Sequence, residues 1–114
     1  MDQRRVERLS EQIRMLISDI LDKNISDPRL EMVNINRILL AKDGSFATVF
    51  YSRVGSESDI EDCKAAMKSA SGFIRCGLSA RMSLRTVPKL RFVYDRSLEE
   101  GEKILGILRE FGDD

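Results

Sequence analysis

The chain has 114 residues, 42% of them hydrophobic, and its 19 basic and 19 acidic residues balance to a net charge of zero. This length allows one domain over residues 1–114, and no apolar run reaches the roughly 18–20 residues that a membrane span requires. Histidine is absent, and Cys63 and Cys76 do not have the spacing of zinc ligands, so we expect no metal site and a reducing cytoplasmic location.

An amphipathic helix is predicted from about Gln3 to Lys23. Arg4 and Arg8 lie opposite its apolar stripe and Arg5 lies at the flank of that stripe. Asp27-Pro28 follows and stops the helix, because proline lacks an N–H and disfavours helical geometry in the preceding residue. The apolar stripe has the three- and four-residue spacing of one helix face: Val6, Leu9, Ile13, Leu16, Ile17 and Ile20.

A β-hairpin is predicted next. Its strands are Met32 to Leu40 and Phe46 to Ser52, joined at Lys42-Asp43-Gly44-Ser45, where Asp-Gly is typical of a tight primed turn. The apolar alternation of the first strand slips by one residue, which predicts a bulge near Asn36-Arg37.

A long helix is predicted to begin near Asp59, with Ser58 or Ser56 as its N-cap. We expect it to bend at the small-residue step Ala70-Ser71-Gly72. It then either shifts phase there or ends before about Met82. Its apolar face keeps the helical period through the step: Ile60, Cys63, Met67, Ala70 and Ile74.

Pro88 precedes a third predicted strand, Leu90 to Tyr94, and Ser97 with Glu100 forms a capping box that opens a last, acidic helix. The order of elements predicts an α+β two-layer sandwich, in which helices pack on one face of a three-stranded sheet.

Basic residues gather in the second half of the chain, and no acidic residue lies among them. They are Arg75, Arg81, Arg85, Lys89 and Arg91. Enzyme chemistry is not indicated, because the chain lacks histidine, the commonest general base. The spacing Gly72-x-x-x-x-Gly77 is that of a phosphate-binding loop, but the lysine that follows in such loops is absent. We therefore expect no catalytic residue and no cofactor.

The residues alone leave two interpretations open. A small-residue bend flanked by cations is compatible with the way KH-type modules hold single-stranded RNA, although the usual Gly-x-x-Gly loop is absent. Alternatively, the small residues only relieve crowding at a bend and the arginines only solvate a face.

Several segments, in order along nearly the whole chain, resemble the ribosome-binding factor A family, bacterial small-subunit maturation factors with a KH-like fold. They are Ser26-Asp27-Pro28-Arg29-Leu30, Lys42-Asp43-Gly44 with Ala47-Thr48-Val49-Phe50-Tyr51, Ala70-Ser71-Gly72-Phe73-Ile74-Arg75, Leu84 to Phe92 and Asp95-Arg96-Ser97. The resemblance implies a KH-like fold of type II with a helix-kink-helix at Ala70-Ser71-Gly72 in place of the Gly-x-x-Gly loop.

The resemblance further implies a non-enzymatic factor that binds the small ribosomal subunit late in its assembly. Such a protein supports processing of the 5′ end of small-subunit rRNA, including at low temperature. Its partners would be rRNA and small-subunit ribosomal proteins. Nothing in the sequence suggests more than a monomer, which we therefore expect. The expected RNA contacts are Arg75, Arg81, Arg85, Lys89 and Arg91, with Arg4, Arg5 and Arg8 in second rank. The alternative is a protein-interaction adaptor that makes no direct contact with RNA.

Overall fold

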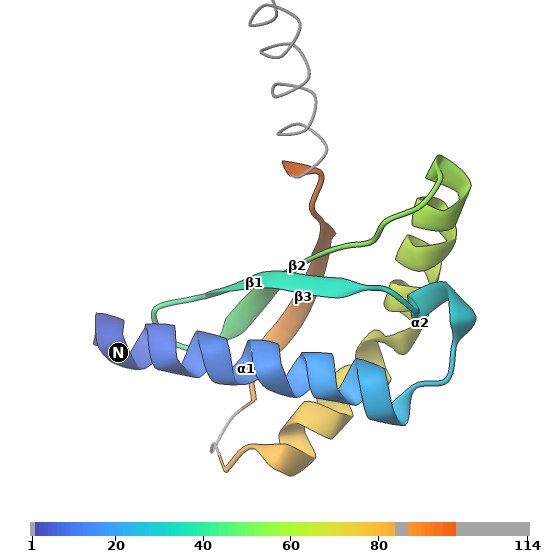
Figure 1. Ribbon diagram of the computed structural model, residues 1–114. Coiled ribbons are helices and arrows are strands. Elements are labelled where there is room, and N and C mark those ends of the chain that lie inside the picture. Colours follow the sequence, from blue (N-terminus) through green and yellow to red (C-terminus); the bar gives the residue numbers. More distant parts are fainter. Residues whose placement is uncertain (1, 84–86, 98–114) are drawn as a thin grey trace, which may run out of the picture.

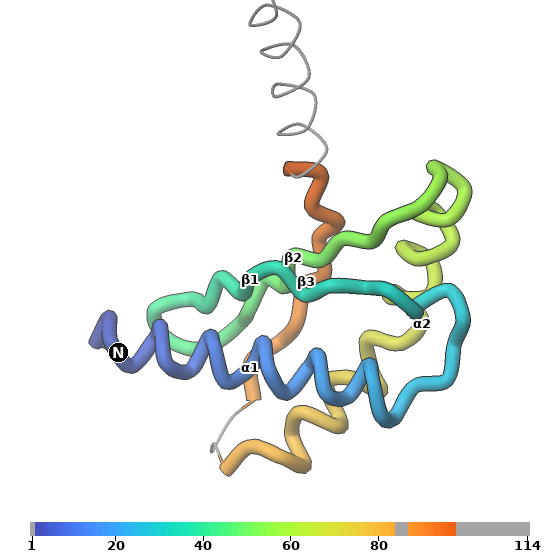
Figure 2. Tube along the Cα trace, viewed as in Figure 1, coloured from blue at the N-terminus to red at the C-terminus, as the bar shows by residue number. Residues whose placement is uncertain are grey.

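Two helices pack on one face of a three-stranded sheet in the computed structural model, which describes residues 2–83 and 87–97 (Figures 1 and 2). The strand order is β1-β2-β3; β1 and β2 are antiparallel, whereas β2 and β3 are parallel. The predicted α+β two-layer arrangement is therefore confirmed, and the expected last helix lies outside the described residues. The elements are α1 (Gln3–Asn24), the 3-10 helix η1 (Pro28–Leu30), β1 (Asn34–Leu40), β2 (Phe46–Ser52), α2 (Glu57–Arg81) and β3 (Lys89–Tyr94).

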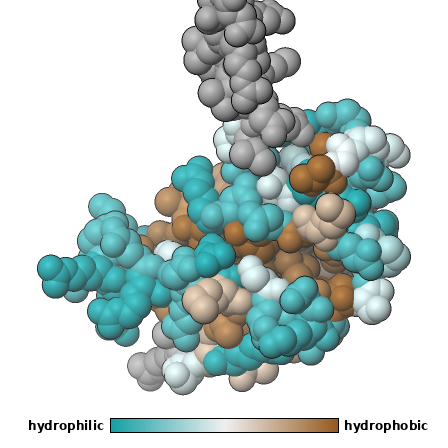
Figure 3. Space-filling model, in the orientation of Figure 1, coloured by the Kyte–Doolittle hydropathy of each residue, from teal (hydrophilic) through white to brown (hydrophobic). Residues whose placement is uncertain are grey.

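Helix α1 confirms the predicted amphipathic helix. Asp2 caps its start by accepting a hydrogen bond of 2.9 Å from the backbone N–H of Arg4. Three isoleucines, Ile13, Ile17 and Ile20, are fully buried on the face turned to the sheet and α2. The N-terminal end of the helix extends beyond this contact and appears at the left of Figure 3 as a hydrophilic projection.

The hairpin has the predicted strands, with β1 beginning two residues later than expected. The pairing shifts between Ile35 and Arg37, so the predicted bulge is confirmed. The predicted type of turn is wrong. Ala41 and Phe46 close a four-residue loop through a backbone bond of 2.9 Å. Within this loop only Gly44 has a positive φ, of 75°, whereas both primed turn types require a positive φ at the first central residue, here Asp43.

Helix α2 begins with a capping box. The Ser56 hydroxyl accepts from the N–H of Asp59, and the Asp59 carboxylate accepts from the N–H of Ser56. The helix is continuous to Arg81, so of the two predicted alternatives the structure shows an end just before Met82.

Strand β3 adds to the sheet beside β2, with Pro88 buried at its start. Leu90, Phe92 and Tyr94 share one face of the strand and pack against the core. The Tyr94 hydroxyl donates to the Arg53 carbonyl at 3.0 Å and accepts from the Arg53 N–H at 3.1 Å. Its ring and that of Phe92 meet the Tyr51 ring edge-on, and burial raises the pKa of Tyr51 to about 12.

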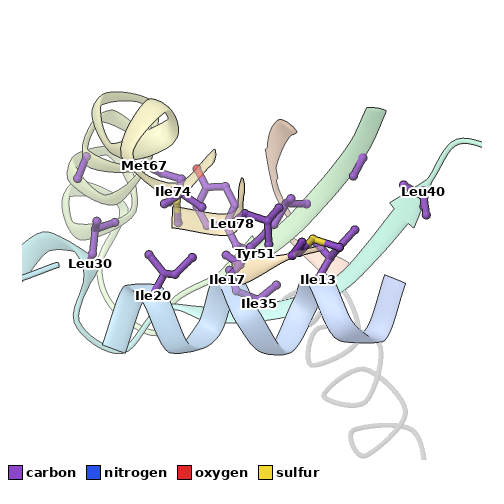
Figure 4. Close-up of a cluster of buried hydrophobic side chains, with 14 of the residues drawn as sticks. Ile13, Ile17, Ile20, Leu30, Ile35, Leu40, Tyr51, Met67, Ile74 and Leu78 are labelled. Carbon is purple, nitrogen blue, oxygen red and sulfur yellow. The ribbon is translucent and has the colours of Figure 1, made fainter. Parts of the chain in front are cut away.

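One hydrophobic core joins both helices to the sheet (Figure 4). Ile17 of α1, Ile35 of β1, Tyr51 of β2 and Ile74 of α2 all contribute to it. Because buried residues hold α2 along its length, this core fixes which faces of the helix are turned to solvent.

Candidate nucleic-acid interface

One exposed stripe of α2 carries cations and small polar residues. Successive members lie three or four residues apart, the spacing that places side chains on one helix face. All members are exposed except Ser71, which is half-buried. The stripe, which we call the α2 stripe, consists of Lys64, Lys68, Ser71, Arg75 and Ser79.

No acidic residue occurs in the sequence between Cys63 and Tyr94, so the segment that carries the α2 stripe contains only cations among its charged residues. Lys64, at its N-terminal end, forms a salt bridge of 3.3 Å with Glu61. Lys68 and Arg75 form no salt bridge with any described residue. These two cations are therefore available to an external anion without loss of an ion pair within the described part of the protein.

The backbone is accessible in the middle of this stripe. A Cβ built on Gly72 would meet no atom within 4 Å, so the packing of the protein does not require a glycine there. Glycine inside a helix costs roughly 1 kcal/mol relative to alanine. Because glycine has no side chain, a glycine that packing does not require leaves the helix backbone open to close approach by a ligand.

Helix α2 also changes direction between its green first turns and its orange-yellow last turns (Figures 1 and 2). Near its middle, the Ser71 hydroxyl donates a hydrogen bond of 2.8 Å to the Lys68 carbonyl. Serine bonds of this kind to the preceding turn often bend helices. The position of the bend at Ala70-Ser71-Gly72 remains a prediction.

A hollow of about 300 Å³ lies between the middle of α2 and the C-terminal end of α1. Ala70 and Phe73 line it from α2, and residues 24–27 line it from the other side. The Phe73 side chain is 54% exposed. Gly72 thus lies between a cationic stripe and an exposed aromatic ring, and such rings are surfaces on which unstacked bases rest.

Arg81 differs from Arg75, because it is bound within the protein. Its guanidinium donates to the Gly77 carbonyl at 2.9 Å and to Asn24 Oδ1 at 2.7 Å. Arg85 lies outside the described residues.

Lys89 and Arg91 lie on a different surface from the α2 stripe. They alternate along β3 with Leu90 and Phe92, which face the helices, so their side chains leave the opposite face of the sheet. Both are exposed.

Arg4, Arg5 and Arg8 form a third group, at the N-terminal end of α1. All three are exposed. The other end of α1 contacts α2 through Asn24 and Arg81, and a helix of 22 residues is roughly 33 Å long. The predicted contacts that the structure describes therefore occupy three separate regions and do not form one patch.

The comparison with known proteins identifies the family. The sequence model of the family described as ribosome-binding factor A matches residues 5–108 of this chain. The chain belongs to the ribosome-binding factor A family. It is 36% identical over 110 residues to ribosome-binding factor A of Staphylococcus carnosus, covering 96% of each chain. It is 40% identical over 97 residues to that of Thiobacillus denitrificans, covering 85% of this chain and 78% of the relative.

Solved structures agree with this assignment. The crystal structure of ribosome-binding factor A from Thermus thermophilus matches with a TM-score of 0.69 and 25% identity, over 78% of this chain and 93% of that one. A Thermotoga maritima protein described as a putative ribosome binding factor A gives a TM-score of 0.67 and 28% identity, over 75% of this chain and 82% of that one. The expected KH-like fold is confirmed.

A third match is a homology model of the Thermus thermophilus factor fitted into the cryo-EM map of a 30S complex of that factor. Its TM-score is 0.67 at 25% identity, over 80% of this chain and 96% of that one.

Within the described residues, no helix is long and apolar enough to span a membrane, and no group of three acidic or cysteine side chains is placed to hold a metal ion.

The sequence-based list of site residues omitted Lys64, Lys68 and Phe73. The helical spacing of Lys64, Lys68 and Arg75 was a usable signal for the first two. The exposure of Phe73 could be seen only in the structure. From the sequence, an apolar residue next to Ile74, which is buried, would be expected to be buried too.

Proposed function

We propose that this protein is a non-catalytic assembly factor that binds the small ribosomal subunit late in its maturation. The observation that carries the proposal is the match, over 80% of this chain, to coordinates fitted into the map of a 30S complex. The relatives from Staphylococcus carnosus and Thiobacillus denitrificans bear the same family name. We further propose that the protein acts as a cytoplasmic monomer.

The α2 stripe is the proposed primary contact with rRNA. Lys68 and Arg75 supply cations for phosphate groups, and open space at Gly72 lets a sugar–phosphate backbone approach the helix. The bend at Ala70-Ser71-Gly72 would set the angle between the two parts of the stripe. Arg4, Arg5 and Arg8 make secondary contacts from the far end of α1.

Binding of this type favours one arrangement of rRNA over others without making or breaking a bond. The proposed consequence is support for processing of the 5′ end of small-subunit rRNA, most strongly at low temperature, when misfolded RNA rearranges slowly.

The test is binding to purified immature small subunits at several salt concentrations, followed by sedimentation. Lys68→Gln with Arg75→Gln should weaken binding and reduce the slope of log affinity against log salt by about 0.7–0.9 for each phosphate group that the variant no longer binds. Arg4→Gln with Arg8→Gln is the matched control, because it removes the same charge from exposed helix positions. We expect this control to have the smaller effect.

Equal effects of the two double variants would contradict the assignment of the α2 stripe as the primary contact. Association that is insensitive to salt and to nuclease would instead support the adaptor alternative. In cells depleted of the protein, 5′-extended precursor rRNA should accumulate and should be cleared by the wild-type chain but not by the Lys68→Gln, Arg75→Gln variant.

A further inference from the structure

The face of the sheet that points away from both helices carries an ordered grid of side chains. Strand pairing places Phe46 beside Lys89, and Thr48 between Leu39 and Arg91. The third row consists of Arg37, Phe50 and Val93. Each row contains one cation, and two of the three rows contain a phenylalanine. We call this surface the outer sheet face.

Two of its apolar side chains are open to solvent. Leu39 is 58% exposed and Phe46 is 46% exposed. Phe50 is half-buried, since the Arg37 guanidinium carbon lies 4.2 Å from the centre of its ring. Arg37 is itself exposed. The guanidinium is therefore held over the ring on an exposed side chain, and a guanidinium is a group on which a base can stack.

The charge of this face is positive and not neutralised by the described residues. Arg37, Lys89 and Arg91 form no salt bridge with any residue that the structure describes. Asp43 lies beyond one end of the grid and accepts hydrogen bonds from Ser45.

Asp95 lies beyond the other end. Its carboxylate accepts hydrogen bonds from the Ser97 N–H at 2.9 Å and from the Asn36 amide at 3.1 Å. Hydrogen bonding by the Ser97 side chain and backbone and by the Asn36 amide, together with the nearby Arg37 charge, lowers the pKa of Asp95. Asp95 therefore lies at the boundary of the positive face and outside its three rows of side chains.

The spacing of the rows suits a single strand. Residues on one face of a strand repeat every two positions, or about 6.6 Å, roughly twice the ~3.4 Å rise per nucleotide of a stacked helix. Bases that rest on neighbouring rows would therefore be unstacked from each other. Unstacked bases on aromatic rings or guanidinium planes, with cations beside them, characterise single-stranded RNA binding. Protein interfaces, in contrast, are depleted of lysine in their core.

We propose that the outer sheet face is a second RNA-binding surface, which takes a short single-stranded segment through stacking on Phe46 and on the Arg37–Phe50 pair. Lys89 and Arg91 contact its phosphates. This inference extends the proposed function, because rRNA is the single-stranded ligand that a small subunit offers. The protein would then hold one RNA element on α2 and another on the sheet.

The experiment uses the full chain and a fluorescein-labelled octauridylate, with a duplex RNA of the same length as the comparison. Phe46→Ala should weaken octauridylate binding by roughly fivefold or more, the effect expected for loss of one base stack. Arg37→Gln and Arg91→Gln test the same face without removing an apolar side chain, so they remain informative if Phe46→Ala folds poorly. Lys68→Gln with Arg75→Gln controls for binding to the α2 stripe and should have the smaller effect on octauridylate.

Three results would overturn the inference. The first is octauridylate binding that none of the Phe46, Arg37 and Arg91 variants weakens. The second is duplex RNA bound as tightly as the single strand. The third is a loss of subunit binding in these variants while octauridylate binding is unchanged, because the face would then hold a protein. Octauridylate binding can fail while the subunit assay succeeds, so the proposed function and this inference are tested separately.

Discussion

Arg81 in the last turn of α2 joins Asn24 in the last turn of α1 through a hydrogen bond of 2.7 Å. The same guanidinium donates to the Gly77 carbonyl, one turn back in its own helix. A cation in the last turn also interacts favourably with the helix dipole. Arg81 therefore has a structural task that Arg75, with no such partner in the described chain, does not share.

This difference predicts that two conservative substitutions affect stability to different extents. Arg81→Lys keeps the charge but loses the guanidinium fork, so the free energy of unfolding should fall by roughly 0.5–1.5 kcal/mol. Arg75→Lys should leave it unchanged within about 0.5 kcal/mol. Urea denaturation of the two variants measures both values. Equal losses would show that the Arg81–Asn24 bond contributes nothing to stability.

Two glycines of α2 give a second prediction. Gly72→Ala should raise the free energy of unfolding by roughly 0.5–1 kcal/mol, because the new methyl group enters open space and alanine favours the helix. A Cβ at Gly77 would instead come within 3.1 Å of Cδ1 of the fully buried Ile20. Overpacking typically costs about 1–3 kcal/mol, so Gly77→Ala should be less stable than Gly72→Ala by at least about 1 kcal/mol in thermal or urea unfolding.

The Gly72→Ala variant also separates an effect on stability from an effect on binding. If RNA approaches the backbone at Gly72, Gly72→Ala should weaken subunit binding even though the protein is more stable. A Gly72→Ala variant that is more stable and binds normally would remove Gly72 from the proposed interface.

Local patterns in the sequence were sufficient for most of the fold. The apolar spacing of α1 and the phase slip near Asn36 each report on short-range geometry, and both predictions are confirmed. The turn type was wrong because Asp43-Gly44 alone does not fix how many residues the loop contains. The hydrogen bonds between Ala41 and Phe46 and between Gly44 and Ala41 do so.

The placement of the cations could not be read from the sequence in the same way. Arg75 and Arg91 are close in sequence, but a helix and a strand present side chains with different periods. Because Leu90 and Phe92 pack against the core, the alternation along β3 turns Lys89 and Arg91 away from the helices. A cluster in the sequence thus becomes two surfaces in the fold, and Arg37 joins one of them from a distant strand.

The last prediction concerns pH. Hydrogen bonds from Ser56 lower the pKa of Asp59, and the Arg96 guanidinium lowers the pKa of Glu57. A carboxyl group whose pKa is lower in the folded state stabilises that state fully above its unfolded value, which is 3.8 for Asp59 and 4.5 for Glu57. This contribution is lost as the pH falls through the folded pKa. Without histidine in the chain, no side chain has an ordinary pKa in the range of about 5 to 8.

We therefore expect the free energy of unfolding to vary little between about pH 5 and 8 and to fall below about pH 4.5. Asp59→Asn should be less stable than the wild type at neutral pH, and the two should converge in acid, where Asp59 is protonated. Asp62→Asn is the matched control, since it removes an exposed carboxylate from the same helix without touching the cap. Urea denaturation across the pH range measures all three proteins. If Asp59→Asn keeps a constant difference from the wild type at every pH, the charge of Asp59 does not stabilise the start of α2.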